Sequence, residues 1–171
     1  MATASSPTLG VIIGNRDFFP DQLVAEARAD VLAVLKAAGV APVMVGPEET
    51  KLGGIETHAE ARRCADLFRR HRDQIDGVLV VLPNFGDEKG VADTLKLSGL
   101  NVPILVQGSP DDLGQLGVAR RRDAFCGKIS VCNNLVQAGI RFSLTSRHVS
   151  ALTSPSFAAD LADFLRVCRV V

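Results

Sequence analysis

The sequence of 171 residues has no tryptophan and no tyrosine, so its aromatic residues are eight phenylalanines. A flavin-binding domain usually stacks such side chains on its isoalloxazine ring, and their absence disfavours that class. Long apolar runs are also missing, because no segment approaches the roughly 18 apolar residues that span a bilayer. The start, MATASSPT, has neither the basic nor the apolar region of a signal peptide. We therefore predict a cytoplasmic protein without a membrane-spanning segment.

An excess of either charge is absent as well. Lysine plus arginine and aspartate plus glutamate number 19 each, so the formal net charge is zero. No overall field would draw the chain to nucleic acid or to an anionic membrane. The cluster ARRRD at 119–123 is a local exception, for which a solvated loop is the favoured interpretation, because nucleic-acid binders show a wider basic face. We predict no nucleic-acid partner.

Several motifs that carry chemistry are missing. There is no G-x-G-x-x-G and no G-x-x-x-x-G-K-[ST], which disfavours dinucleotide and P-loop nucleotide sites. A phosphoacceptor domain would need an aspartate where Leu82-Pro83-Asn84 stands. The four cysteines lack C-x-x-C spacing, and we predict that they are reduced and mostly buried: Cys64, Cys126, Cys132 and Cys168. The three histidines show no metal-ligand spacing, and no triplet of nucleophile, base and orienting group is evident. The sequence predicts no catalytic residue and no metal ligand in this chain.

What is present is a regular alternation of strand and helix patterns. Apolar runs typical of buried strands lie at 9–13, 77–82 and 102–108, with shorter strands expected at 41–45 and 141–145. Helices are expected from Pro20 to Gly39, from a capping box at Thr57 and Glu60 to about Gln74, at 91–99, at about 128–138, and after Ser154-Pro155. This pattern predicts a single α/β domain over residues 1–171, a Rossmann-like, three-layer α/β/α fold with five parallel strands in the flavodoxin-type order 2-1-3-4-5.

In such a sheet, ligands bind beyond the carboxyl ends of the strands. The loop after the first strand, GNRDFFP, combines Arg16 and Asp17 with two phenylalanines. Asn84, Phe85 and Gln107 follow later strands and could bind a polar, hydroxylated ligand. Structural roles are alternatives: Asn15 in a left-handed turn, Arg16 with Asp17 as a surface ion pair, Asn84 in a turn, and Phe18 with Phe19 as a hydrophobic staple or an interface patch. The last helix ends on Val170 and Val171 without a polar cap, so we expect the natural polypeptide to continue.

Five segments, taken in order, resemble the amino-terminal domain of the L-fucose isomerase and L-arabinose isomerase family. They are GNRDFFP (14–20), LPNFGDE (82–88), FCGKISVCNNL (125–135), GIRFSLTSRHV (139–149) and FLRVCRVV (164–171). The resemblance spans essentially the whole chain. It implies a Rossmann-like substrate-recognition domain of an enzyme that interconverts an aldose and a ketose.

The resemblance also implies partners and site residues. A divalent metal, usually manganese, would be held by later domains that this chain lacks, so no cofactor is expected here. The parent would form a homo-oligomer, trimer or hexamer, in which this domain covers the active site of a neighbouring subunit. Arg16 would contact the monosaccharide, and Phe85, Ser130 and Asn133 would approach it. The substrate-binding residues that we predict are Arg16, Asp17, Asn84, Phe85, Ser130 and Asn133.

Two other hypotheses stay open. The chain could be a stand-alone sugar-binding or regulatory module, or a structural oligomerisation domain that uses Phe18 and Phe19 as its interface. In all three hypotheses the 171-residue chain is inactive by itself.

Overall fold

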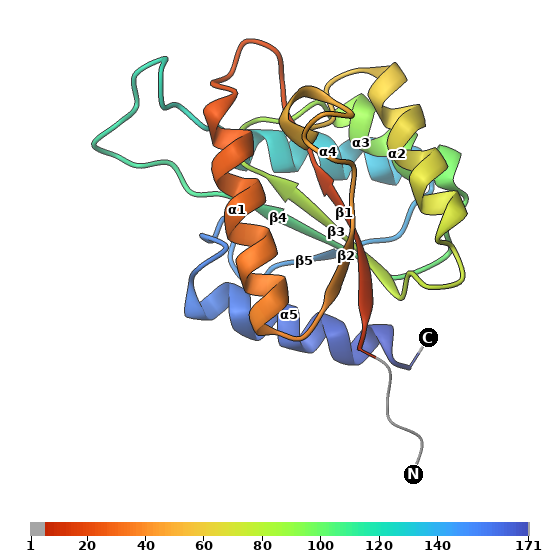
Figure 1. Ribbon diagram of the computed structural model, residues 1–171. Coiled ribbons are helices and arrows are strands. Elements are labelled where there is room, and N and C mark those ends of the chain that lie inside the picture. Colours follow the sequence, from red (N-terminus) through yellow and green to blue (C-terminus); the bar gives the residue numbers. More distant parts are fainter. Residues whose placement is uncertain (1–5, 171) are drawn as a thin grey trace.

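The computed structural model describes residues 6–170, which form one parallel sheet flanked by helices (Figure 1). The elements in chain order are β1 (Thr8–Ile13), α1 (Gln22–Ala37), β2 (Ala41–Val43), a 3-10 turn (Lys51–Gly53), α2 (His58–Arg70), β3 (Gly77–Leu82), α3 (Glu88–Ser98), β4 (Ile104–Gly108), α4 (Ala124–Gln137), β5 (Ser143–Leu144) and α5 (Pro155–Cys168). The strand order is β2-β1-β3-β4-β5, and every pairing is parallel. This confirms the predicted three-layer, doubly wound fold.

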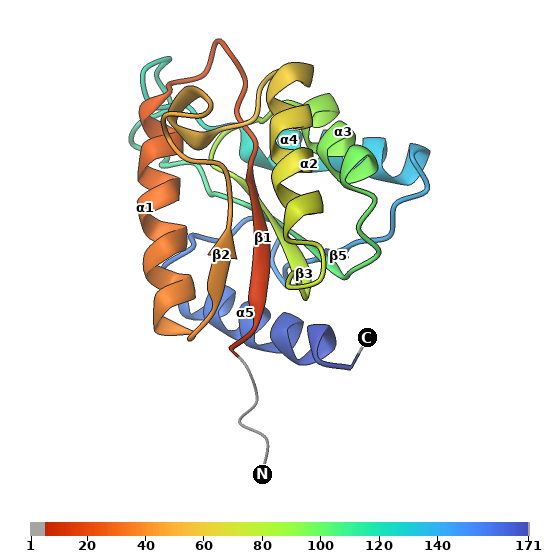
Figure 2. The ribbon, with the colours of Figure 1, turned by 45° about the vertical axis from the view of Figure 1, so that its right-hand side comes forward.

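Helices cover both faces of the sheet, as Figures 1 and 2 show from two directions. The helix faces that pack on the sheet are apolar. Alternate residues of a strand point to opposite faces. On β1, Val11 and Ile13 therefore pack with α1 and α5, whereas Ile12 packs with α2, α3 and α4. Because the three central strands are buried on both faces, their sequences read as continuous apolar runs.

Several helix ends follow the signals in the sequence. Thr57 and Glu60 form the capping box of α2. The Ser154 side chain caps α5, with Pro155 in its first turn. Gly39 and Gly99 adopt the left-handed conformations that end α1 and α3, as expected.

Other boundaries were predicted wrongly. The helix α3 begins at Glu88 and not near residue 91, because the Asp87 side chain accepts a hydrogen bond from the Gly90 amide and caps it. The helix α4 begins at Ala124, directly after Asp123 in a left-handed conformation, and not at Lys128. The helix α1 begins at Gln22, after the proline expected in its first turn, and α2 ends at Arg70 instead of near residue 74. The outer strands β2 and β5 are shorter than expected, at three and two residues, because each pairs on one side only.

One close packing contact connects α4 to the loop after β3. A Cβ atom added at Gly127 would lie 1.7 Å from the carbonyl oxygen of Phe85. The absence of a side chain at Gly127 therefore allows the first turns of α4 to approach the β3–α3 loop. That loop carries Phe85, so this helix start helps to set the position of a predicted site residue.

Candidate functional site

The loops after β1 and β3 meet at the carboxyl edge of the sheet, where Arg16 is held between two neighbours. The guanidinium carbon of Arg16 lies 4.6 Å from the centroid of the Phe85 ring, within the range of a cation–π contact. Its Nη2 atom lies 3.1 Å from Oε2 of Glu88, in the first turn of α3. The Arg16 side chain keeps 28% of its surface exposed, so it can still reach a ligand. We call Arg16, Phe85 and Glu88 the arginine site.

Two further phenylalanines extend this site. Phe19 is buried, and its ring centroid lies 6.3 Å from that of Phe85 in a stacked arrangement. Phe18 lies 4.8 Å from Phe19 but is 74% exposed. The two rings therefore have different roles. Phe19 packs against Phe85 in the interior, whereas Phe18 presents an apolar surface to solvent or to a partner.

A buried amide pair fixes the two loops relative to each other. The Asn84 amide nitrogen donates to Oδ1 of Asn15 at 2.5 Å, and the Gly86 amide donates to Oδ1 of Asn84 at 3.0 Å. Asn15 itself donates to Glu56 and, at 3.4 Å, to Asp21. Asn84 is thus engaged within the protein through both ends of its amide and shapes the turn that presents Phe85. Asn15 is fully buried and is not left-handed, so the interpretation of a left-handed turn was wrong.

Carboxylates surround Lys51 beside the arginine site. The Lys51 ammonium lies 2.8 Å from Asp21, 3.7 Å from Glu56 and 3.9 Å from Asp17. The hydrogen bond to Asp21 is the main cause that raises the pKa of Lys51, and burial raises the pKa of Glu56. The ion pair between Arg16 and Asp17, which was a structural alternative for these residues, does not form, because Arg16 pairs with Glu88 and Asp17 lies near Lys51.

Ser130 and Asn133 lie on α4 and are not in the arginine site. They follow Gly127 by one and two helical turns, which places them about 5 and 9 Å further along the helix axis, away from the rim. Ser130 is half-buried, and its carbonyl accepts a hydrogen bond from Asn134; Asn133 is exposed. The structure thus brings together Arg16, Phe85 and, through the turn, Asn84, while Asp17 is an exposed neighbour.

The three arginines of the β4–α4 loop form ion pairs with two carboxylates. Arg120 and Arg122 lie 2.8 and 3.4 Å from the carboxylate of Glu26 on α1, and Arg121 lies 2.6 Å from Asp123. Arg122 also donates to the carbonyl of Pro83 at 3.0 Å. These contacts agree with a solvated, locally paired loop.

Two buried polar side chains lie at the ends of β4 and β5: Gln107, which the sequence offered as a ligand contact, and Lys128, which was not singled out. The Lys128 ammonium donates to Thr145 at 2.7 Å and to the carbonyl of His148 at 3.0 Å, and burial lowers its pKa. Gln107 donates to the carbonyl of Ser150 at 2.7 Å. These contacts hold the β5–α5 loop on the sheet edge, so Gln107 acts in the fold here. The sequence did offer a signal for Lys128, because it is the single charged residue of α4.

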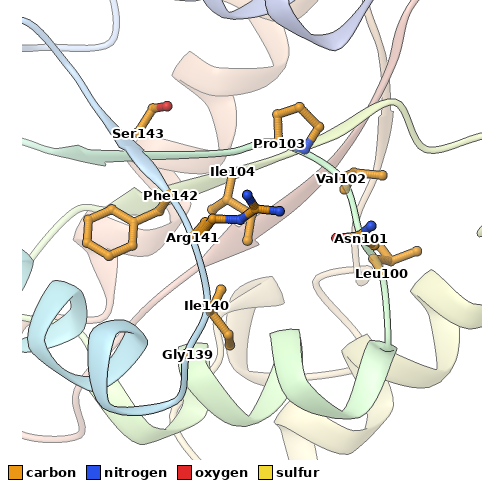
Figure 3. A pocket seen from close by; sticks show the side chains of 10 residues that line it. All are labelled: Leu100, Asn101, Val102, Pro103, Ile104, Gly139, Ile140, Arg141, Phe142 and Ser143. Atoms are coloured by element: carbon orange, nitrogen blue, oxygen red, sulfur yellow. The ribbon is translucent and has the colours of Figure 1, made fainter. Parts of the chain in front are cut away.

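A cavity of about 510 Å³ lies at the opposite, amino-terminal edge of the sheet. Figure 3 shows Leu100–Ile104 on one side of it and Gly139–Ser143 on the other, with Arg141 reaching between them. Apart from Arg141, this cavity has no charged residue and no group suited to acid–base chemistry. In open α/β sheets the carboxyl edge is the functional one, so we place the candidate site at the arginine site.

Residues 6–170 contain no group of three or more His, Cys, Asp or Glu side chains arranged to hold a metal ion. The carboxylates nearest the arginine site already surround the Lys51 ammonium. The described residues therefore do not fit a metal centre. In the same part of the chain, no helix is long and apolar enough to cross a membrane.

Comparison with models of protein families identifies the family of this chain. The family model described as the fucose/sulfoquinovose isomerase N-terminal domain matches residues 10–171. A search of curated proteins found no match to this chain.

Proposed function

Because the chain belongs to the family of fucose/sulfoquinovose isomerase N-terminal domains, we propose that it recognises the substrate of a sugar aldose–ketose isomerase. The observation that carries this proposal is the held but partly exposed Arg16 at the carboxyl edge of the sheet. An arginine fixed by Phe85 and Glu88 presents its remaining N–H groups in a set direction. Such a donor suits the oxygens of a sugar.

The domain would contribute binding, orientation and exclusion of water. Arg16 donates hydrogen bonds to the sugar, and the rings of Phe18 and Phe85, packed on the buried Phe19, form an apolar border that limits access of water. In the assembled enzyme the domain acts as a lid over the active site of a neighbouring subunit. A divalent metal, manganese by family resemblance, would be held by domains outside this chain and would polarise the sugar oxygens there.

An uncharged face on α4 supports assembly into a homo-oligomer. Phe125, Ile129 and Val136 are 43%, 57% and 66% exposed on one side of this helix. Between Asp123 and Arg141 the single charged residue is Lys128, which is buried. An exposed helix face normally carries charges, and a neutral apolar face can meet its own copy without like-charge repulsion. We assign this face to contacts between subunits of a trimer or hexamer.

The same face favours a second candidate, a structural oligomerisation domain without a role in sugar recognition. The two functions differ in what Arg16 does, because assembly through α4 does not need the arginine site. A stand-alone sugar-binding module is the remaining alternative.

The test is an aldose-to-ketose isomerisation assay with manganese, run on the 171-residue chain and on the product of the uninterrupted reading frame. We expect turnover of L-fucose or L-arabinose by the longer protein and none by the chain. If neither protein isomerises a sugar, the isomerase proposal fails. Sugar-induced chemical-shift changes at the rim of the isolated chain would then favour the binding module, and assembly without sugar affinity would favour the structural domain.

A further inference from the structure

The contact between Arg16 and Glu88 bears on which sugars the arginine site accepts. Their charges lie 3.1 Å apart, and both side chains are mostly buried, at 28% and 18% exposed. At this distance and burial, the carboxylate offsets most of the positive charge that Arg16 would show to a ligand. The Phe85 ring covers another side of the guanidinium.

The Glu88 carboxylate also keeps unused capacity to accept hydrogen bonds. Its Oε2 atom is buried against Arg16 without a hydrogen-bond partner among the described residues, and a sugar hydroxyl would meet the carboxylate at the part of the side chain that stays exposed, 18% of its surface. A hydroxyl group can donate to a carboxylate and accept from a guanidinium at the same time. A sulfonate is an anion that only accepts, so it can satisfy Arg16 but not Glu88.

The carboxylates next to the arginine site also disfavour a negatively charged sugar. Asp17, Asp21 and Glu56 surround Lys51, which leaves this neighbouring group with more carboxylates than cations. The three arginines of the β4–α4 loop are paired with Glu26 and Asp123.

Three other cations lie near the carboxyl edge. Lys128 is buried beneath the β5–α5 loop. Arg147, on that same loop, follows the strand at the far end of the sheet from β2 and β1. Lys89, exposed next to Glu88 in the first turn of α3, has no ion-pair partner among the described residues, so the neutralisation by Glu88 concerns Arg16 and not every cation near the site.

The matched family is described by one neutral sugar, fucose, and one sulfonated sugar, sulfoquinovose. We propose that Glu88 is a specificity-determining residue that neutralises Arg16 and restricts this enzyme to uncharged sugars, rejecting sulfonated ones. This inference rests on the proposed function, because it assumes that Arg16 meets the sugar. It assigns to Glu88 a role that neither the family match nor the resemblance gives it.

The experiment measures kcat/KM of the intact enzyme for L-fucose and for sulfoquinovose, in the wild type and in Glu88→Gln. We expect the wild type to prefer the neutral sugar and Glu88→Gln to lower that preference by roughly tenfold or more, because the anion no longer meets a like charge. Glu88→Asp keeps the charge and should retain much of the preference. Asp163→Asn on α5 makes the same change of charge far from the site and should leave the ratio unchanged.

Salt dependence gives a readout that does not need a variant to fold. In the wild type, rejection of the sulfonated sugar should weaken as ionic strength rises, because salt screens the repulsion. Equal efficiency of the wild type on both sugars, or an unchanged ratio in folded Glu88→Gln, would overturn the inference and leave the proposed function standing. A wild type that isomerises neither sugar would instead overturn the proposed function.

Discussion

Arg16 owes its orientation to residues that come from two different loops. The Phe85 ring and the Glu88 carboxylate contact its guanidinium group, and the buried Asn15–Asn84 pair connects the loops that carry them. An arginine side chain that is already fixed before the ligand binds loses less conformational entropy on binding. We therefore expect substitution of Arg16 to have the largest effect on sugar recognition.

We predict that Arg16→Ala in the intact enzyme lowers kcat/KM by about tenfold to a few hundredfold. The reason is the loss of one or two polar contacts to the substrate, worth about 1.5–3 kcal/mol. Arg166→Ala, an exposed arginine on α5, is the matched control and should leave kcat/KM unchanged. An Arg16→Ala enzyme with wild-type kcat/KM would remove Arg16 from the site.

A second prediction at the residue scale concerns Lys128 and pH. Burial lowers the pKa of this lysine in the folded chain below its ordinary value of 10.5. Between the lowered pKa and 10.5 the unfolded chain binds more protons than the folded one, so Lys128 makes the free energy of unfolding rise with pH in that window. Lys128→Met lacks this contribution.

Urea unfolding of the 171-residue chain at several pH values up to about 10 measures this difference. The wild type should gain stability relative to Lys128→Met as the pH rises toward 10.5. Parallel dependences of the two proteins on pH would show that the buried ammonium is not the cause.

At the scale of elements, the start of α4 is fitted to the loop after β3. Gly127 lies against the carbonyl of Phe85, and the next residue, Lys128, makes hydrogen bonds to Thr145 and to the β5–α5 loop. One helix therefore positions two of the loops on the carboxyl edge. A change at its start should affect both the stability of the fold and the arginine site.

We predict that Gly127→Ala destabilises the chain by about 2 kcal/mol, because a Cβ atom at this position would overlap backbone atoms of Phe85. Thermal or urea unfolding measures the loss. Gly117→Ala is a matched control, since a Cβ atom there meets nothing within 4 Å. Equal stability of the two variants would contradict the tight contact.

For the molecule as a whole, the uncharged α4 face predicts how the enzyme assembles. Ile129→Glu combined with Val136→Glu places two charges on this face, and we expect the oligomer of the intact enzyme to dissociate. Light scattering coupled to size exclusion measures the mass. Val167→Glu, a half-exposed residue of α5 on the other side of the sheet, should not change the mass. An unchanged oligomer in the double variant would place the interface elsewhere.

The architecture could be predicted because it depends on patterns that are local in the sequence. Each of these patterns is complete within a few residues. They are the continuous apolar runs of β3 and β4, the capping box at Thr57 and the glycines after α1 and α3. Starts of helices were predicted less well where the signal was small, as at Asp87, or where a loop led straight into a helix, as at Asp123.

The candidate site could be predicted only in part. The rim loops and Arg16 followed from the rule that ligands bind at the carboxyl edge of such a sheet. Glu88 and Lys128 were missed, since their importance comes from neighbours 72 and 17 or more residues away in the chain. Sequence spacing carries no record of such contacts.

By itself, then, the sequence determined the class of fold and the order of its elements, and it predicted the edge of the sheet that holds the candidate site, because periodicity, caps and strand order follow from local stereochemistry and hydrophobic burial. Only the tertiary structure decided which charges meet. It paired Arg16 with Glu88 instead of Asp17, surrounded Lys51 with carboxylates and left one face of α4 without charge at the surface. The strength of an ion pair depends on the distance between the charges and on their burial, so it is set by the folded arrangement of distant segments.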